Sequence, residues 1–181
     1  MAHEIVLAGF GGQGILFLGK MIASAGMLDG KQVSWIPSYG PEMRGGTANC
    51  SVVVSDRLIG MPVVPHPNVL VAMNRPSLEK FEPRMQPKGF LLVNKTLIEI
   101  RHTRQDIQAA YLEITGIAAQ IGNPRLANVV ALGALIWLVP IVTRASAIEA
   151  LKMELSGKKA ALLDLNLQAL DAGQTAALAP A

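Results

Sequence analysis

The segment Glu4-Ile-Val-Leu-Ala8 runs directly into Gly9-Phe-Gly-Gly-Gln-Gly14, and this junction decides the fold of the chain. A short apolar run that ends in a glycine cluster indicates a buried strand followed by a tight turn. A helix is then expected from Ile15 to Met27, because Asp29-Gly30 supplies a stop signal with glycine at the C-cap. Lys31–Ile36 is expected to form the next strand. Strand, helix and strand in this order make a βαβ unit, which predicts a parallel sheet with helices on its faces.

The rest of the chain continues this alternation and then becomes helical. Further elements are expected as strands at Thr47–Ser55, Val69–Met73, Gly89–Asn94 and Tyr111–Thr115, and as a short helix at Pro76–Phe81. Helices are expected from about Gly116 onward, over Leu126–Leu138, Ser146–Leu155 and Lys159–Leu170. The whole pattern predicts a single α/β domain over residues 1–181. It is Rossmann-like and three-layered, with a mostly parallel sheet, a glycine-rich loop after the first strand and a helical C-terminal part.

The composition is apolar for a soluble domain. Hydrophobic residues make up 51% of the chain and charged residues only 16%, whereas about 25% charged residues is typical. The apolar stretch Val129–Val142 is too short to span a membrane, and Met1–Glu4 lacks the basic-then-apolar layout of a signal peptide. We therefore expect a cytoplasmic subunit of a larger assembly, with no membrane partner.

Charge and metal-ligating residues exclude several other classes. The net charge is +3, and the basic residues are dispersed, which argues against binding to nucleic acid. The one cysteine, Cys50, cannot hold an iron–sulfur cluster or a structural zinc alone, and the three histidines lack ligand spacing. We expect Cys50 to be an inert buried thiol, Trp35 and Trp137 to lie in the core, and Asn128 to be a hydrogen-bonded amide. Asn128 lies on the helix Leu126–Leu138, which is expected to be buried on every side.

The glycine turn allows three interpretations. It matches the dinucleotide fingerprint, but a ribose-binding acid should follow at the end of the second strand, where Trp35-Ile-Pro-Ser38 has none. The segment Gly14–Lys20 also spells GxxxxGK, but its apolar middle and the following Met21 argue against a P-loop. Either the turn binds another phosphate-bearing ligand, or its glycines only let strand and helix pack closely. If a ligand binds, the Gln13 amide and the Lys20 ammonium are candidate contacts.

The segment Ser38–Gly46 forms a second candidate loop. Two prolines and three glycines between Pro37 and Gly46 rule out regular structure. Because the loop follows a parallel strand, we expect it beside the first loop at the carboxyl edge of the sheet. Arg44, followed by two glycines, is suited to a carboxylate or a phosphate. The other interpretation is a rigid turn whose arginine forms a surface ion pair.

Together the two loops resemble those of the gamma subunit of 2-oxoacid:ferredoxin oxidoreductases. The matching segments are Gly9–Ile15, Tyr39–Gly46, Ser51–Ser55, Asn128–Ala134 and Asn166–Gly173. They extend over almost the whole chain. The Tyr-Gly-Pro-Glu-x-Arg-Gly-Gly loop looks most like that of the 2-oxoglutarate and branched-chain oxoacid members, and less like that of the indolepyruvate members.

The resemblance implies a division of labour between subunits. Thiamine diphosphate, magnesium and the iron–sulfur clusters would lie on alpha and beta subunits, with a ferredoxin-like delta subunit as an optional partner. This chain would contribute to a shared coenzyme A site, and the complex would convert a 2-oxoacid, expected to be 2-oxoglutarate, to acyl-CoA and CO2 while reducing ferredoxin. No catalytic residue is expected on this chain. The residues expected to contact the coenzyme are Gly9, Gly11, Gly12, Gln13, Gly14, Lys20, Ser38, Tyr39, Glu42, Arg44, Gly45 and Gly46.

The sequence leaves two alternatives open. The chain could be a non-catalytic scaffold whose two loops are interface surface. It could also be a stand-alone Rossmann-type NAD-binding oxidoreductase, although the missing acid at Ile36-Pro37 disfavours that class.

Overall fold

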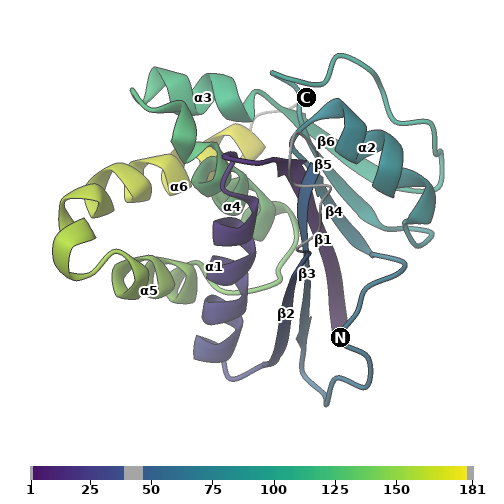
Figure 1. Cartoon of the computed structure of the whole chain (residues 1–181), viewed down its shortest axis with the longest axis horizontal. Helices are drawn as coiled ribbons and strands as arrows, with labels where there is room; N and C mark the ends of the chain where they lie inside the picture. Colours follow the sequence, from purple (N-terminus) through teal and green to yellow (C-terminus); the bar gives the residue numbers. More distant parts are fainter. Residues whose placement is uncertain (1, 39–46, 179–181) are drawn as a thin grey trace.

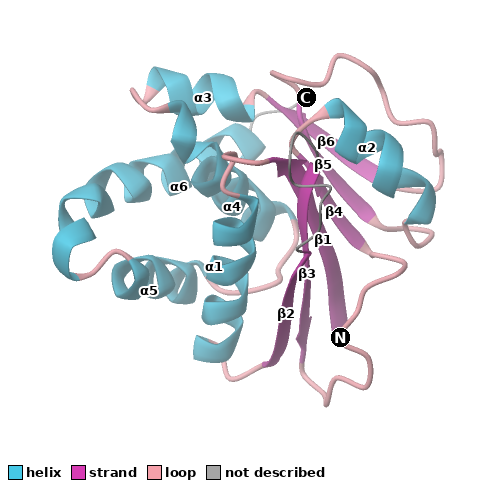
Figure 2. Ribbon diagram, viewed as in Figure 1, coloured by secondary structure: helices cyan, strands magenta, loops and turns pink. Residues whose placement is uncertain are grey.

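The computed structural model describes residues 2–38 and 47–178. They form a three-layer α/β domain, with a twisted sheet between helices on its two faces (Figures 1 and 2). The strands are β1 (Ala2–Phe10), β2 (Gln32–Ser38), β3 (Thr47–Ser55), β4 (Val69–Ala72), β5 (Phe90–Asn94) and β6 (Gln108–Leu112). The α-helices are α1 (Ile15–Leu28), α2 (Arg75–Phe81), α3 (Ile114–Gln120), α4 (Ala127–Leu138), α5 (Arg144–Glu154) and α6 (Leu163–Leu178). Short 3-10 helices are η2 (Glu82–Arg84), η3 (Pro124–Leu126) and η4 (Gly157–Leu162).

The sheet is mixed, with the strand order β2-β3-β1-β4-β5-β6. Strands β1, β4, β5 and β6 pair in parallel, so the expected mostly parallel sheet is confirmed. The simple βαβ unit is wrong in one respect, because β3 lies between β1 and β2 and is antiparallel to both. As a result β2 points the same way as β1 without touching it.

Two apolar cores flank the sheet, because alternate residues of each strand face opposite layers. Ile5 and Leu7 of β1 pack with α1, α4, α5 and α6. Val6 and Ala8 face the other way, toward Leu78 of α2. The helices in Figure 1 divide accordingly, with α2 alone on its side of the sheet.

Helices α4 and α6 cross at backbone contact distance. A Cβ built on Gly133 would lie 1.9 Å from the carbonyl oxygen of Leu170, and one on Gly173 would lie 2.0 Å from that of Val130. Glycine at both positions therefore sets the separation of the two helices. This crossing explains why residues 127–135 of α4 are all buried. The expectation of burial on every side is wrong for the last turn, where Trp137 is 49% exposed.

Several element boundaries differ from the sequence-based expectations. The sixth strand begins three residues before the expected Tyr111, and the expected helix Lys159–Leu170 is a 3-10 turn followed by the longer α6. Trp35 is half-buried and packs against the core as expected. None of the helices in the described residues is long and apolar enough to cross a membrane.

Candidate functional site

The glycine turn joins β1 to α1 at the carboxyl edge of the parallel strands. The half-buried Gln13 side chain closes this turn. Its Oε1 accepts a hydrogen bond from the Phe10 backbone N–H at 2.6 Å, and its Nε2 donates to the Met73 carbonyl at 3.3 Å. The Gln13 backbone N–H also donates to the Phe10 carbonyl at 3.2 Å. The Gln13 amide is therefore committed to holding the turn, and a ligand would meet the backbone rather than this side chain.

Two glycines of the turn have backbone conformations that other residues avoid. Gly12 has φ 90° and Gly14 has φ 72°, both in the left-handed region. Gly14 is also crowded, since a Cβ there would lie 2.2 Å from Nδ2 of Asn128. Asn128 donates from Nδ2 to the Gly14 carbonyl at 3.4 Å and accepts at Oδ1 from the Val129 N–H at 2.9 Å. The expectation that Asn128 is a hydrogen-bonded amide is confirmed.

A pocket of about 270 Å³ opens on this turn. It is lined by Phe10, Gly11, Gly12, Gly14, Ile15, Leu16, Phe17 and Ala48. No side chain among the described residues caps the N-terminus of α1. The first N–H groups of a helix lack partners within the helix, and they lie at the positive end of its dipole. Uncapped amides beside glycines without side chains form an arrangement that suits a phosphate.

Lys20 does not join this pocket. Its Nζ lies 2.5 Å from Oε2 of Glu154 at the end of α5. The hydrogen bond from Lys20 lowers the pKa of the Glu154 carboxyl, with a further contribution from the charge of Lys159. The structure thus places the Lys20 ammonium against α5 and pairs it with a carboxylate, which leaves it poorly placed to bind a ligand at the turn.

The second loop is bracketed by two described residues at the same edge. Thr47 at the start of β3 is the register partner of Phe10, and Ser38 at the end of β2 is the partner of Asn49. Both ends of the loop therefore lie at the same edge of the sheet as the glycine turn, Thr47 on the strand next to β1 and Ser38 one strand further out. The remaining predicted contacts, Tyr39, Glu42, Arg44, Gly45 and Gly46, lie outside the described residues.

A carboxamide cluster that sequence reasoning missed ties three strand ends together. The Met73 carbonyl, just after β4, accepts from Gln13 and also from Nδ2 of Asn94 at 3.3 Å. Asn94, fully buried at the end of β5, donates in addition to Oγ1 of Thr115 at 2.8 Å. The available signal was an asparagine at or just beyond the end of each of two buried strands: Asn94 is the last residue of β5, and Asn74 lies two residues after β4. The cluster fixes the edge on which the glycine turn rests.

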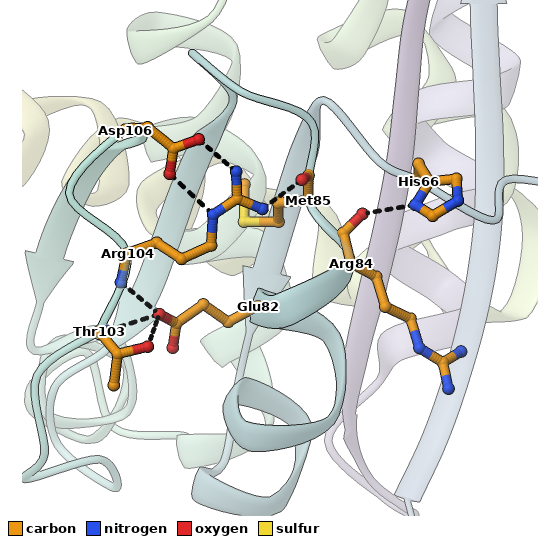
Figure 3. A network of polar contacts seen from close by, with 7 residues as sticks. All are labelled: His66, Glu82, Arg84, Met85, Thr103, Arg104 and Asp106. Atoms are coloured by element: carbon orange, nitrogen blue, oxygen red, sulfur yellow. Dashed lines mark hydrogen bonds and ion pairs between the residues drawn. The ribbon is translucent and has the colours of Figure 1, made fainter.

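Another polar network lies away from this edge and is structural. Figure 3 shows Glu82 of η2 receiving hydrogen bonds at Oε1 from Thr103 and from the Arg104 N–H. Arg104 in turn donates to both carboxylate oxygens of Asp106 and to the Met85 carbonyl. The network holds the loop between β5 and β6 against η2.

Neither the cysteine thiol nor the potential metal ligands in the described residues form a second candidate site. Cys50 is fully buried in β3, and burial raises the pKa of its thiol to about 12, as expected for an inert cysteine. No group of three or more histidine, cysteine, aspartate or glutamate residues in the described part of the chain could hold a metal ion.

Comparison with known proteins decides the family. The model of the pyruvate ferredoxin/flavodoxin oxidoreductase family matches residues 4–176. The chain belongs to this family. It is 39% identical over 171 residues to the ketoisovalerate oxidoreductase subunit VorA of Methanothermobacter thermautotrophicus, covering 94% of this chain and 35% of that protein. It is 38% identical over 149 residues to the 2-oxoglutarate synthase subunit KorC of Methanocaldococcus jannaschii, covering 81% of this chain and 80% of KorC. The chain thus spans about a third of the length of VorA and most of KorC.

Solved structures of this family share the fold. The gamma subunit of a keto/oxoacid ferredoxin oxidoreductase from Geobacter sulfurreducens superposes with a TM-score of 0.84 at 32% identity, over 98% of this chain and 99% of that one. A 2-oxoglutarate:ferredoxin oxidoreductase from Magnetococcus marinus, solved with 2-oxoglutarate, coenzyme A and succinyl-CoA bound, gives a TM-score of 0.90 at 26% identity. That match covers 99% of this chain and 32% of that one.

Proposed function

We propose that this chain is the gamma subunit of a 2-oxoacid:ferredoxin oxidoreductase and forms one wall of its coenzyme A site. The observation that carries the proposal is the likeness, at TM-score 0.90 over 99% of the chain, to an enzyme solved with coenzyme A bound. The uncapped N-terminus of α1 and the glycine turn supply a second argument, since their backbone donors suit a diphosphate.

Within this site, the backbone around Gly11, Gly12 and Gly14 would hold the coenzyme A diphosphate. Gln13 would act indirectly, by keeping the turn closed through Phe10 and Met73. The segment Ser38–Gly46, anchored at the same edge, would bring Arg44 to a phosphate or to the substrate carboxylate. Glu42, in the same segment, would fix the loop or a partner contact.

The assembled enzyme would convert a 2-oxoacid and coenzyme A to acyl-CoA, CO2 and a proton, and two ferredoxins would each take one electron. The thiamine diphosphate, magnesium and iron–sulfur clusters that such chemistry uses would be held by alpha and beta subunits, with or without a delta subunit. The single cysteine of this chain is consistent with that arrangement. Cytoplasmic assembly with these subunits is part of the proposal, and 2-oxoglutarate is the substrate we expect, ahead of a branched-chain oxoacid.

A purely structural role is the second candidate, and one surface favours it. An apolar groove of about 380 Å³ runs beside the edge strand β6 and is bordered by Tyr111, Leu112, Leu138 and Ala177. The exposed Trp137 is adjacent in sequence to Leu138. A sheet edge beside an apolar groove is suited to a partner subunit.

Reconstitution with the co-purified partner subunits separates the two candidates. We expect Arg44→Ala to raise the KM for coenzyme A or for the oxoacid in ferredoxin-reduction assays, with 2-oxoglutarate and 2-oxoisovalerate compared as substrates. Arg57→Ala is the matched control, because Arg57 follows β3 at the opposite edge of the sheet. Unchanged KM values for both substrates in Arg44→Ala would leave only the scaffold role for that residue.

A further inference from the structure

A second cavity lies next to the glycine turn. It has a volume of about 320 Å³ and is enclosed by α1, η3, α4, α6 and the segment that connects α5 to α6. Phe17 lines both this cavity and the glycine-turn pocket. Asn128 borders the cavity and donates its hydrogen bond to Gly14 of the turn. The two spaces are therefore neighbours, and one extended ligand could occupy both. We call the second space the Arg125 cavity.

The lining of the Arg125 cavity is mostly apolar and includes four polar side chains. Leucines from η3, η4 and α6, together with Phe17, provide the apolar surface. Three asparagines and Arg125 provide the polar groups, and no carboxylate lines the cavity within the described residues. A volume at the lower end of the usual range for ligand pockets, about 300–1,000 Å³, suits one nucleoside-sized group better than a whole coenzyme.

Several polar groups of the cavity have hydrogen-bond donors or acceptors without a partner among the described residues. Arg125 is exposed, and its guanidinium forms no ion pair or hydrogen bond with the described residues. Asn166 is only 7% exposed; its Nδ2 donates to the Leu162 carbonyl at 2.8 Å, while its Oδ1 accepts nothing from the described residues. Asn123 accepts at Oδ1 from the Arg125 backbone N–H at 3.1 Å, and its amide N–H groups remain available. The cavity therefore offers one cation, one nearly buried acceptor and one amide donor pair.

We infer that the Arg125 cavity binds the 3′-phosphoadenosine end of coenzyme A, an inference that rests on the function proposed above. Carboxamides are the side chains that pair with the donor and acceptor edge of adenine. The apolar surface and Phe17 suit the faces of the ring. A free guanidinium in a wall without carboxylates suits the 3′-phosphate. The pantetheine arm is neutral and has to reach a reaction centre outside this chain, so it would leave the glycine turn on the other side.

The 3′-phosphate gives a direct test, because dephospho-CoA lacks only that group. In the assembled enzyme, we expect Arg125→Gln to raise the KM for coenzyme A about tenfold and the KM for dephospho-CoA less than about twofold. Arg57→Gln is the control, since Arg57 is also exposed and its guanidinium has no partner among the described residues. It should leave both KM values unchanged. If Arg125→Gln raises both KM values equally, or neither, the assignment of the phosphate to Arg125 is wrong.

A second variant tests where the adenosine lies. Leu162, which lines the cavity, is 48% exposed, so a larger side chain can be added there without repacking the core. Leu162→Trp should fill the cavity and raise the KM for coenzyme A and for dephospho-CoA alike, with an unchanged unfolding midpoint. Unchanged KM values would overturn the inference. They would leave the proposed function standing if a negative charge introduced at the glycine turn by Gly11→Asp still raises the KM for coenzyme A relative to Gly11→Asn. The two failures can therefore be told apart.

Discussion

Gly14 has a left-handed backbone conformation and a close contact with Asn128, and Gly14→Ala should be destabilising for both reasons. Its left-handed backbone, with φ 72°, costs an alanine about 1 kcal/mol. The new Cβ would lie 2.2 Å from Nδ2 and 2.8 Å from Cγ of Asn128, so the asparagine must move. Moving it sacrifices its hydrogen bonds to the Gly14 carbonyl and the Val129 N–H, at about 1 kcal/mol each. We therefore expect a loss of about 3 kcal/mol in the free energy of unfolding.

Gly12→Ala is the matched control for this prediction. Gly12 has φ 90°, but a Cβ there would meet nothing within 4 Å. Only the backbone penalty of about 1 kcal/mol should appear. Urea unfolding followed by circular dichroism measures both losses, and Gly14→Ala should lower the unfolding midpoint well beyond Gly12→Ala.

A double-mutant cycle identifies the source of the difference. In the Asn128→Ala background the two closest atoms, Nδ2 and Cγ, are removed and only the Cβ of residue 128 remains, at 3.1 Å from the new methyl group, so Gly14→Ala should cost about 1–2 kcal/mol there. The reasoning is refuted if Gly14→Ala and Gly12→Ala destabilise equally, or if Asn128→Ala leaves the cost of Gly14→Ala unchanged.

Four further predictions concern the fold around the site. Gly133→Ala should destabilise by about 3 kcal/mol or more, because its Cβ would lie 1.9 Å from a backbone oxygen of α6. Gly116 lies in the first turn of α3, and the nearest atoms to a Cβ there are at 3.6 Å, so Gly116→Ala should be neutral or stabilising in the same urea assay. Burial disfavours the charge of Asp29, but hydrogen bonds from Ser146 and Thr143 outweigh it and lower the pKa of this carboxyl. Its stabilising contribution is therefore present above about pH 4 and is lost as the pH falls through the lowered pKa. Acid unfolding of Asp29→Asn should lack that component, and an identical acid profile would contradict this. Cys50, with its pKa raised to about 12, should not react with a disulfide reagent at pH 8 until the protein unfolds; rapid reaction of the native protein would show that it is accessible.

The local elements could be predicted from sequence because their signals are local. The apolar run before Gly9 marked β1, the glycine after Asp29 marked the end of α1, and β-branched residues marked β3 over its full length. The order of strands could not be predicted in the same way. The insertion of β3 between β1 and β2 depends on pairing between residues far apart in sequence, and no local pattern records it.

In the candidate site, too, the features with a local sequence signal could be predicted and the long-range contacts could not. The turn and its place at the sheet edge followed from the glycine spacing. The partners of its side chains did not, because Gln13 bonds to Met73 and Lys20 to Glu154, residues distant in sequence. The apolar pattern of α4 also gave a wrong prediction of burial at Trp137, which is exposed. Such a pattern cannot distinguish a face in the core from a surface available to a partner.

The central claim is that the glycine turn binds the coenzyme A diphosphate, and charge placed at Gly11 tests it most directly. A Cβ on Gly11 would meet nothing within 4 Å, and Gly11 is not among the residues with positive φ. Aspartate and asparagine should therefore be equally well tolerated there, and they differ essentially in charge. In the assembled enzyme, we predict that Gly11→Asp raises the KM for coenzyme A about tenfold over Gly11→Asn, with the KM for the oxoacid unchanged. Equal KM values for coenzyme A in the two variants would contradict the account.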